Sequence, residues 1–414
     1  MYPLDNRVQE YAWGSRTAIA ELLGRSSPSP RPQAELWLGA HPSAPSRVER
    51  GGHWESLLEV IANAPEDQLG AAVVSKFGPT LPFLFKVLAA ETPLSLQAHP
   101  NAEQARAGFD AEERAQVPLS SSRRQYKDRN HKPELLCALG PFELLCGFRR
   151  ASETARFLAA LRIEPLSASV AALEHEPNSE RIKSLSSWIL SLDEPKRLDL
   201  VAAALEACQK HAQTGGQFAG ECSWAVRIAS LYPGDIGVVM ALLLNLVTLE
   251  AGQAIYLPAG NLHSYLKGVG LEIMANSDNV IRGGLTPKHV DVGELLRVLT
   301  FTDGPVQIIS PDGEGPERIY GTPASEFCLS RITLGGSDGL ASGRSGSPPA
   351  DGFRADERLG PEILLCTEGN FTITSSDGTS RSVPKGASWF VPAKSGTYGL
   401  KGAGTLFRAR VGAL

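Results

Sequence analysis

Ser95, Gln97 and His99 occupy alternate positions of a short segment that follows the apolar run at residues 83–88. On a β-strand, residues two apart point to the same face, so these three polar side chains would lie together. A polar triplet on one face is unusual for a core strand and favours a binding or catalytic site. A lone histidine on such a strand, however, is more often a structural residue whose hydrogen bonds are satisfied.

Two further segments concentrate side chains that can do chemistry. Residues 126–134 are mostly charged or histidine, a pattern that on its own is also typical of a solvated turn. Residues 257–289 alternate apolar stretches with polar groups that include His263, Glu272 and Arg282. Because burying such groups without a purpose is costly, this alternation favours a functional site.

The elements that must position these segments change character along the chain. Short apolar clusters at residues 35–39, 82–88 and 135–139, bounded by glycine and proline, predict strands. Residues 152–231 instead repeat apolar side chains at spacings of three and four, which predicts packed helices. From Asn245 onward, strand and turn patterns return. The sequence therefore predicts a mainly β protein with a helical insert.

This change of pattern predicts three domains. Residues 1–150 together with residues 232–304 would form the catalytic domain, residues 151–231 a helical insert domain, and residues 305–414 a C-terminal domain. Within the last of these, the Gly/Ser/Pro-rich stretch at residues 335–352 lacks periodicity and predicts a mobile surface loop.

A weak internal repeat relates the two β regions. Residues 250–263 can be aligned with residues 384–397, and both copies contain a glycine, a few apolar residues and then Pro-Ala. The pattern is similar to the strand–turn–strand unit of a cupin barrel. Where the first copy has His263, the second has Thr397, a poor zinc ligand, so we expect the C-terminal barrel to bind no metal. Turn residues at 368–370 predict a break between strands there.

Composition excludes several classes of protein. The net charge of −5 and a pI near 6.0 argue against a nucleic-acid partner, because binding to the phosphate backbone needs a basic face. We expect no membrane span, since the most apolar run, residues 238–249, is short and contains Asn245. The N-terminus lacks a signal-peptide pattern, and the cysteines show no CxxC spacing, which favours reduced thiols in a cytoplasmic protein. We also expect a monomer.

The polar segments closely resemble type I mannose-6-phosphate isomerases (phosphomannose isomerases) of the cupin superfamily. The resemblance is carried by Gln97-Ala98-His99-Pro100, Asn130-His131-Lys132-Pro133-Glu134, Pro258-Ala259-Gly260-Asn261-Leu262-His263-Ser264-Tyr265 and Asn276-Ser277-Asp278-Asn279-Val280-Ile281-Arg282. Tyr11-Ala12-Trp13-Gly14 and Ala34-Glu35-Leu36-Trp37-Leu38-Gly39 match the same family. The resemblance implies cupin (jelly-roll) barrels, one catalytic and one metal-free, and a zinc-dependent interconversion of mannose 6-phosphate and fructose 6-phosphate.

The resemblance implies one zinc ion held by Gln97, His99, Glu134 and His263. Two imidazoles, a carboxylate and an amide oxygen form a donor set suited to zinc, with room for water or substrate oxygens. His131 would be a fifth protein ligand and would close the open position, so we interpret it as a residue that orients the ligands or adjusts the charge.

Aldose–ketose isomerisation moves a proton between two carbons beside a carbonyl, so the developing enediolate needs positive charge. Lys132, next to a metal ligand, could supply a second cation. Glu272 is the first side chain to test as the base, although a zinc-bound hydroxide or a histidine remains an alternative.

Arg282 and Lys288 flank the Gly283-Gly284 pair and suit phosphate capture, and the resemblance places both at the active site, with Ser95 as a further contact. Lys288 could also be only a solvated residue in a turn. Trp13 and Trp37 are expected to pack in the core and are left out of the site.

Two functions of other classes fit parts of the pattern. One is a metal-binding bicupin that senses sugars without catalysis, and the other is an iron-dependent cupin oxygenase. The cations expected around one metal make binding without catalysis the less economical explanation. Iron cupins usually use two histidines and a carboxylate without a glutamine ligand.

Overall fold

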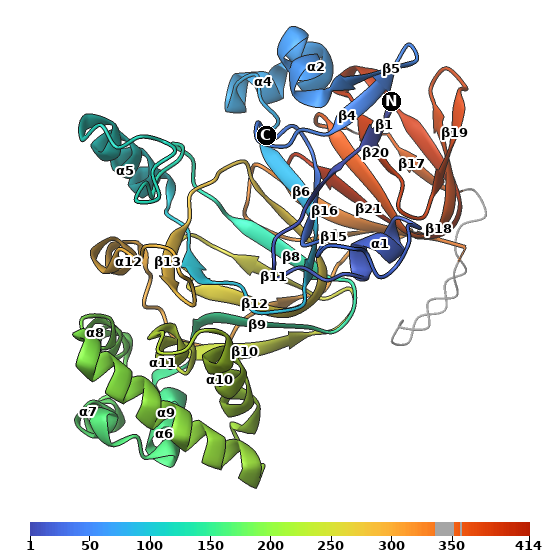
Figure 1. Ribbon diagram of the computed structural model, residues 1–414. Helices are drawn as coiled ribbons and strands as arrows, with labels where there is room; N and C mark the ends of the chain where they lie inside the picture. Colours follow the sequence, from blue (N-terminus) through green and yellow to red (C-terminus); the bar gives the residue numbers. More distant parts are fainter. Residues whose placement is uncertain (336–351, 357) are drawn as a thin grey trace.

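The chain is described by a computed structural model that covers residues 1–335, 352–356 and 358–414. Within these residues it consists of two large antiparallel β-sheets with a cluster of helices beside the first sheet (Figure 1). The prediction of a mainly β, cupin-like protein with a helical insert is confirmed. The surface loop predicted over residues 335–352 lies, except for its two end residues, outside the described part of the chain.

The first sheet surrounds one long strand, β12 (His263–Ala275). Its main path runs β14 (Ile308–Ile309), β11 (Ala254–Leu257), β8 (Glu134–Ala138), β12, β6 (Phe83–Ala90), β3 (Glu35–Leu38) and β2 (Arg7–Gln9). Four more strands extend it: β7 (Leu96–Ala98), β9 (Phe142–Phe148), β10 (Leu244–Leu249) and β13 (Ile281–Gly284). The strands predicted at residues 35–39, 82–88 and 135–139 therefore exist, and β12 pairs with β6, β7, β8 and β9.

The second sheet combines the C-terminal strands with strands from the N-terminus. Its path runs β15 (Glu317–Tyr320), β16 (Cys328–Leu334), β21 (Tyr398–Arg410), β18 (Glu362–Ser375), β20 (Ser388–Val391), β1 (Tyr2–Asp5), β4 (Arg47–Arg50) and β5 (His53–Ser56). β17 (Phe353–Ala355) pairs with β21, and β19 (Ser380–Pro384) pairs with β18. The turn predicted at residues 368–370 is wrong, because β18 continues through it with a register shift between Cys366 and Glu368 and a positive φ at Gly369.

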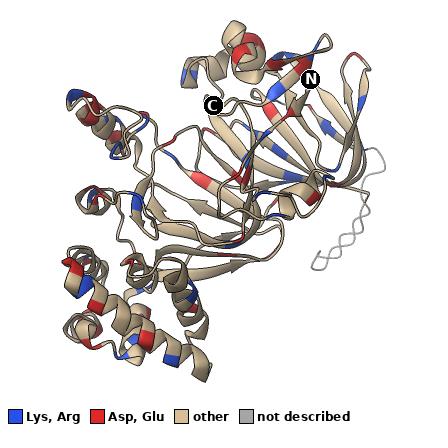
Figure 2. Ribbon diagram, viewed as in Figure 1, with Lys and Arg blue, Asp and Glu red and all other residues tan. Residues whose placement is uncertain are grey.

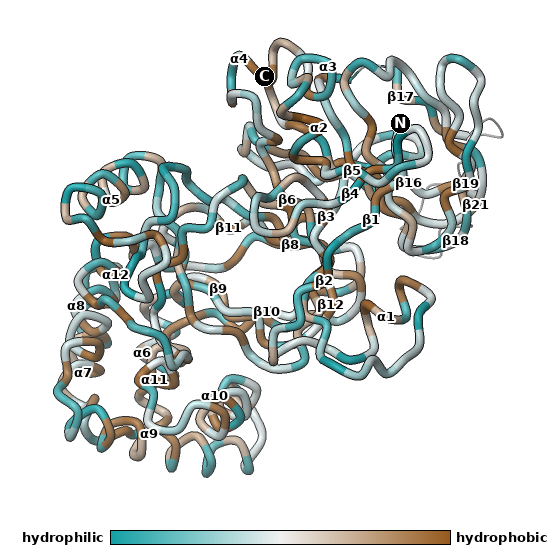
Figure 3. Tube along the Cα trace, turned by 45° about the horizontal axis from the view of Figure 1, so that its top comes forward, coloured by the Kyte–Doolittle hydropathy of each residue, from teal (hydrophilic) through white to brown (hydrophobic). Residues whose placement is uncertain are grey.

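Helices fill residues 151–241; the apolar spacing predicts those up to residue 231, and one further helix follows that range. They are α6 (Ala151–Leu161), η1 (Glu164–Leu166), α7 (Ser167–His175), α8 (Ser179–Leu190), α9 (Glu194–Thr214), α10 (Ala219–Leu231) and α11 (Gly237–Ala241). Asn178 and Asp193 cap α8 and α9, and Pro195 stands in the first turn of α9. Figure 3 shows hydrophobic and hydrophilic residues alternating along these helices, as expected of amphipathic helices with one packed face.

The other helices lie outside residues 151–241. They are α1 (Ala18–Leu22), α2 (Leu57–Asn63), α3 (Pro65–Leu69), α4 (Ala71–Phe77), α5 (Ala102–Arg114), α12 (Val292–Val298) and η2 (Ala393–Ser395). Helices α1, α2 and α4 contribute to the core that both sheets share. No helix among the described residues combines the length and the apolar character needed to cross a membrane.

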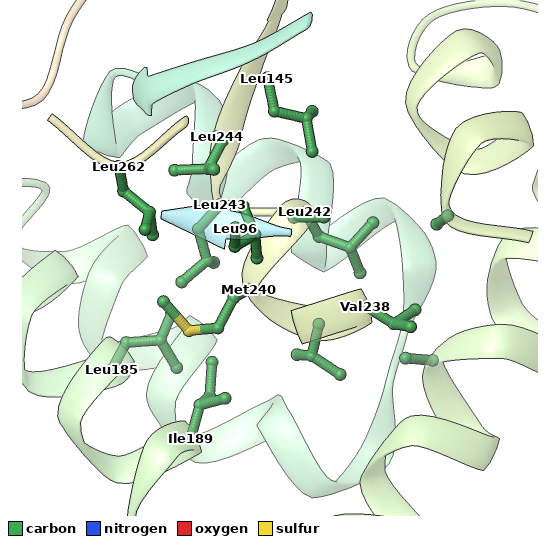
Figure 4. Packing of buried hydrophobic residues seen from close by; sticks show 14 of the residues in the cluster. Leu96, Leu145, Leu185, Ile189, Val238, Met240, Leu242, Leu243, Leu244 and Leu262 are labelled. Atoms are coloured by element: carbon green, nitrogen blue, oxygen red, sulfur yellow. The ribbon is translucent and has the colours of Figure 1, made fainter. Parts of the chain in front are cut away.

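The helical insert shares a hydrophobic core with the first sheet. Figure 4 shows Met240 of α11 close to Leu185 and Ile189 of α8, with Leu96 of β7 beside it. All four side chains are buried and belong to one cluster. The helices are therefore packed onto the strands that carry the polar segments rather than being connected to them only through loops.

The internal repeat is visible in strand register. Leu257, the residue before Pro258, pairs with Glu134, and Val391, the residue before Pro392, pairs with Glu362. The next strand of each copy repeats this relation. Glu272 of β12 pairs with Leu136, two residues after Glu134, and Arg408 of β21 pairs with Leu364, two residues after Glu362. Glu362 and Arg408 are thus the counterparts of Glu134 and Glu272 in the second sheet.

Glu362 is buried in a cluster of positive charge. One of its oxygens lies 3.0 Å from Nε of Arg358, and the other accepts hydrogen bonds from Nε of Arg408 at 2.9 Å and from the Tyr398 hydroxyl at 2.7 Å. Burial favours the neutral carboxyl, but Arg408 outweighs burial and lowers the pKa of Glu362. Since both oxygens are engaged by donors, we still expect the second sheet to bind no metal.

We expect Glu362→Gln to lower stability without affecting the catalytic site. Removing one partner of a buried ion pair leaves buried charge unmatched and costs about 3–5 kcal/mol. The midpoint of urea unfolding should fall accordingly, whereas the same charge change at exposed Glu368 on β18 should have little effect. A change below about 1 kcal/mol, the range of exposed pairs, would contradict a structural role for this cluster.

Candidate functional site

A pocket of about 380 Å³ opens at the end of the first sheet where β7, β12 and β13 meet. Seven of the predicted site residues line it: Ser95, Gln97, Lys132, Glu134, Glu272, Arg282 and Lys288. The two remaining predicted residues, His99 and His263, lie against Glu134. The structure therefore brings together side chains that are far apart in the sequence.

His99, Glu134 and His263 form a buried cluster whose ligand atoms all lie within 4.8 Å of one another. Nε2 of His99 is 3.4 Å from Oε1 of Glu134, and Nε2 of His263 is 3.4 Å from Oε2 of the same carboxylate. All three side chains are almost completely inaccessible to solvent. Two imidazoles and a carboxylate at this spacing match the ligands that zinc prefers.

Hydrogen bonds orient both imidazoles towards the cluster. Nδ1 of His99 is 2.7 Å from the backbone oxygen of Asn279, and Nδ1 of His263 is 3.1 Å from that of Asn261. Because a carbonyl oxygen can only accept, each Nδ1 carries a proton, and in the neutral imidazole Nε2 then has the lone pair that binds metals. Nε2 of His99 and Oε2 of Glu134 are buried without a hydrogen-bond partner, which fits a metal ion between them.

Gln97 occupies the strand position next to these ligands. On β7 it pairs with His263 of β12 on one side and with Arg282 of β13 on the other. Its side-chain amide nitrogen lies 3.4 Å from Nε2 of His263, so the amide group is within reach of the same cluster. The period of two predicted for Ser95, Gln97 and His99 is therefore realised around β7, and Ser95 lines the pocket.

Positive charge surrounds the carboxylate of Glu134. Nζ of Lys132 is 2.9 Å from Oε1 of Glu134, and both groups are buried. Burial favours neutral Glu134, but the Lys132 ammonium outweighs it and holds the pKa of Glu134 well below its usual range. Burial, followed by Lys132, lowers the pKa of His99 to about 4. The imidazole of His99 is consequently neutral at physiological pH, which is the form that binds metals.

A buried network beside the cluster contains residues that the sequence analysis missed. Nζ of Lys86 lies 3.0 Å from Oε2 of Glu272 and 3.6 Å from Oε1 of Glu35, and the Tyr265 hydroxyl donates to Oε1 of Glu272 at 2.9 Å. Burial lowers the pKa of Lys86, but Glu272 and Glu35 outweigh it and raise the pKa above its usual value. All four side chains line the pocket.

Lys86 could have been found from the sequence, because it is the charged residue inside the apolar run at residues 83–88. Trp37, which was expected to pack in the core, donates a hydrogen bond from its indole nitrogen to Glu35 at 2.7 Å. The Lys86 ammonium lies over its ring, 5.4 Å from the centroid. Trp13 lines the pocket, contrary to the expectation that it only packs in the core.

Arg282 and Lys288 form the cationic end of the pocket. Burial lowers the pKa of Arg282, and burial together with Arg282 lowers the pKa of Lys288. Among the described residues neither side chain forms an ion pair within 4 Å, so both charges remain available to an anion. A guanidinium and an ammonium at one end of a pocket suit a phosphate group.

His131 lies outside the metal cluster. Its Nε2 is 2.7 Å from a carboxylate oxygen of Glu326, a residue of the C-terminal part of the chain. The interpretation that His131 is not a ligand fits this geometry, since the side chain turns away towards the second sheet.

Comparison with known proteins agrees with this site. A family model for the phosphomannose isomerase type I catalytic domain matches residues 1–151. The mannose-6-phosphate isomerase of Escherichia coli K12 is 38% identical over 99% of this chain and 99% of its own length. The human mannose-6-phosphate isomerase is 34% identical over 81% of this chain and 83% of its own length.

Solved structures agree as well. A crystal structure of a point variant of phosphomannose isomerase from Salmonella typhimurium matches with a TM-score of 0.88 and 35% identity, covering 100% of this chain and 99% of that one. A zinc-bound mannose 6-phosphate isomerase matches with a TM-score of 0.87 and 35% identity, covering 99% of both chains. With relatives this similar over its full length and a buried His–Glu–His cluster in a cationic pocket, the chain belongs to the type I phosphomannose isomerase family.

Proposed function

We propose that this pocket interconverts mannose 6-phosphate and fructose 6-phosphate with one zinc ion held by Gln97, His99, Glu134 and His263. The observation that carries the proposal is the pair of buried atoms without a hydrogen-bond partner, Nε2 of His99 and Oε2 of Glu134, at the wall of a pocket lined by cations. Zinc-bound relatives and the family model support the choice of metal and reaction.

The reaction needs stabilisation of negative charge on the two sugar oxygens beside the transferred proton. When bound, zinc supplies Lewis-acid polarisation of such oxygens. Lys132, held 2.9 Å from Glu134, adds a fixed positive charge at the wall of the pocket. Because the side chains of Lys132, Glu134 and Glu272 are buried, this charge acts in a medium of lower dielectric than water, which strengthens its effect on an enediolate.

Glu272 remains the first side chain to test as the base. It lines the pocket, and its carboxylate is held in place by Lys86 and the Tyr265 hydroxyl. These two donors fix its orientation in the pocket. Proton transfer depends on the position of the substrate carbon relative to this carboxylate.

Arg282 and Lys288 would bind the phosphate, with Ser95 as a further contact on the pocket wall. The phosphate carries its charge throughout the reaction, so these cations contribute binding in the ground state and the transition state alike. Their main effect should therefore be on KM rather than on kcat.

We expect Arg282→Ala to raise KM for mannose 6-phosphate by at least about tenfold, since a lost charge-assisted hydrogen bond costs about 1.5–3 kcal/mol. Steady-state kinetics of the variant would measure this. Arg106→Ala removes an exposed arginine on α5 and serves as the control, with KM unchanged. An unchanged KM for Arg282→Ala would contradict its role in phosphate binding.

A coupled assay for fructose 6-phosphate formed from mannose 6-phosphate tests the proposed reaction. We expect turnover by the purified protein and zinc as the bound metal. The non-catalytic sensor would bind the sugar without turnover, and the oxygenase would contain iron and consume oxygen. Neither alternative is favoured by any relative described above.

We also propose that the protein acts as a cytoplasmic monomer without a nucleic-acid partner. All pocket residues come from one chain, so a second copy is not needed to complete the site. The cysteines are free among the described residues, which fits a reducing compartment. Figure 2 shows acidic and basic residues interspersed along the helices, and the net charge of −5 does not favour a phosphate backbone as partner. Light scattering and cell fractionation would test these assignments.

A further inference from the structure

The segment that connects α10 to α11 touches the end of β13 and the loop that follows it, which carries Lys288. The side chain of Asp235 contacts both segments. One carboxylate oxygen accepts a hydrogen bond from the backbone N–H of Thr286 at 3.2 Å, and the other accepts from the backbone N–H of Gly237 at 2.7 Å. Asp235 thus connects the start of α11 to the loop between Arg282 and Lys288.

The backbones of the two segments are in direct contact. A Cβ atom added at Gly237 would lie 2.8 Å from the backbone nitrogen of Leu285, and one added at Gly284 would lie 2.8 Å from Cα of Gly237. Such distances are shorter than side-chain carbons tolerate, so glycine is needed on both sides of this contact. The two segments are therefore packed as closely as their backbones allow.

The loop itself adopts a conformation that needs support. Leu285 is buried and has a φ of +54°, a left-handed conformation that is unfavourable for a residue with a branched side chain. The Thr286 hydroxyl in turn accepts a hydrogen bond from the backbone N–H of Lys288. The position of Lys288 relative to Arg282, which is held in β13 by its pairing with Gln97, therefore depends on a turn that is held by contacts from outside the loop.

The helical insert provides a rigid base for this contact. Val238 and Met240 of α11 are buried in the cluster that joins the helices to β7, and Figure 4 shows them in this packing. Tyr232 lines the pocket, and its hydroxyl donates to the backbone oxygen of Pro93, two residues before Ser95. The end of the insert thus contacts the pocket from two directions.

We propose that Asp235 is a positioning residue through which the helical insert sets the affinity of the site for the phosphate group of the substrate. The inference rests on the proposed function, in which Arg282 and Lys288 bind this phosphate. Without the Asp235 carboxylate, the N–H of Thr286 loses its acceptor and the left-handed turn at Leu285 loses support. Lys288 is then no longer held at a fixed distance from Arg282 of β13 and from the metal cluster.

Asp235→Asn tests the proposal, because it keeps the size of the side chain and removes the charge and one acceptor. We expect KM for mannose 6-phosphate and the inhibition constant of inorganic phosphate to rise together by about tenfold, as for loss of a charge-assisted hydrogen bond. The kcat at saturation and the zinc content should stay within about twofold of wild type, because KM changes alone when uniform binding is lost. A general loss of structure would instead lower kcat and zinc content.

Asp199→Asn is the matched control. Asp199 lies exposed on α9 of the same insert and forms none of the hydrogen bonds or ion pairs found among the described residues, so it makes the same charge change without touching the loop. We expect its KM and its phosphate inhibition constant to equal those of wild type. A rise in both variants would show a long-range charge effect and would overturn the positioning role.

Gly237→Ala provides a second test without any change of charge. Alanine favours helix more than glycine does, so α11 itself should tolerate the change. The added methyl would press against Leu285, and we expect the same joint rise in KM and phosphate inhibition constant. If Asp235→Asn fails to fold, the KM and the phosphate inhibition constant of Gly237→Ala test whether this contact positions the loop.

The outcomes separate this inference from the proposed function. If wild type does not isomerise mannose 6-phosphate, the proposed function fails. If wild type turns over and phosphate competes, but Asp235→Asn and Gly237→Ala leave both constants unchanged, only the positioning role is wrong.

Discussion

Replacing Glu134 with alanine should remove the metal and nearly all isomerase activity while the chain stays folded. Glu134 contacts both imidazoles of the cluster, and the four-ligand set would lose its only carboxylate. Since the metal is expected to contribute several kcal/mol to catalysis, turnover should fall by at least about a hundredfold. Metal analysis by mass spectrometry and the coupled assay would be run on the same sample.

His263→Ala should behave in the same way, and it leaves the Lys132–Glu134 pair intact, so any instability from unpaired Lys132 is avoided. His175→Ala removes an exposed histidine of α7 and is the control, with metal and turnover unchanged. Full zinc occupancy with near-normal turnover in either Glu134→Ala or His263→Ala would reject the ligand set.

Glu272→Gln should lower kcat by about a hundredfold or more, the range expected for loss of a general base. Glutamine keeps the shape of the side chain and can still accept from Tyr265, so KM should change much less. Incorporation of solvent deuterium at the transferred carbon should fall in parallel, because it reports proton exchange through the base.

Glu35→Gln is the control for charge balance around Lys86, which contacts both carboxylates. It should reduce kcat far less than Glu272→Gln does. If Glu272→Gln keeps wild-type turnover and deuterium exchange, Glu272 is not the base. Equal losses in the two variants would indicate that both residues act only by holding Lys86.

Local patterns in the sequence predict much of the fold and several residues of the candidate site. The alternation of Ser95, Gln97 and His99 predicted a strand that presents polar groups to one side, and β7 with its flanking residues does so. Spacings of three and four predicted the helical insert. These signals are readable because each depends on residues that are neighbours in the chain.

Other features depend on pairing between distant strands, for which one sequence holds no local signal. Lys86 reaches Glu272 only because β6 pairs with β12 in one register, with those two residues opposite each other. Strand β1 joins β20 across almost the whole chain, so N-terminal residues complete the C-terminal sheet. The predicted domain limits, which assign residues 1–150 to the catalytic domain, remain a prediction, and β1, β4 and β5 lie in the second sheet.

Asp235 was missed for a related reason. It lies where the helical pattern ends, and nothing in its neighbourhood indicates that its carboxylate holds Thr286, 51 positions later. The repeat between the two sheets was visible as Gly and Pro-Ala, but the equivalence of Glu134 and Glu362 required the register.

Titration of the metal-free protein with zinc tests the central claim most directly. The chelator-treated protein should form no fructose 6-phosphate from mannose 6-phosphate. Activity should then rise linearly with added zinc and stop rising at one equivalent per chain, as expected for a single site formed by His99, Glu134 and His263. Full activity in the metal-free protein, or zinc-saturated protein that forms no fructose 6-phosphate, would contradict the account.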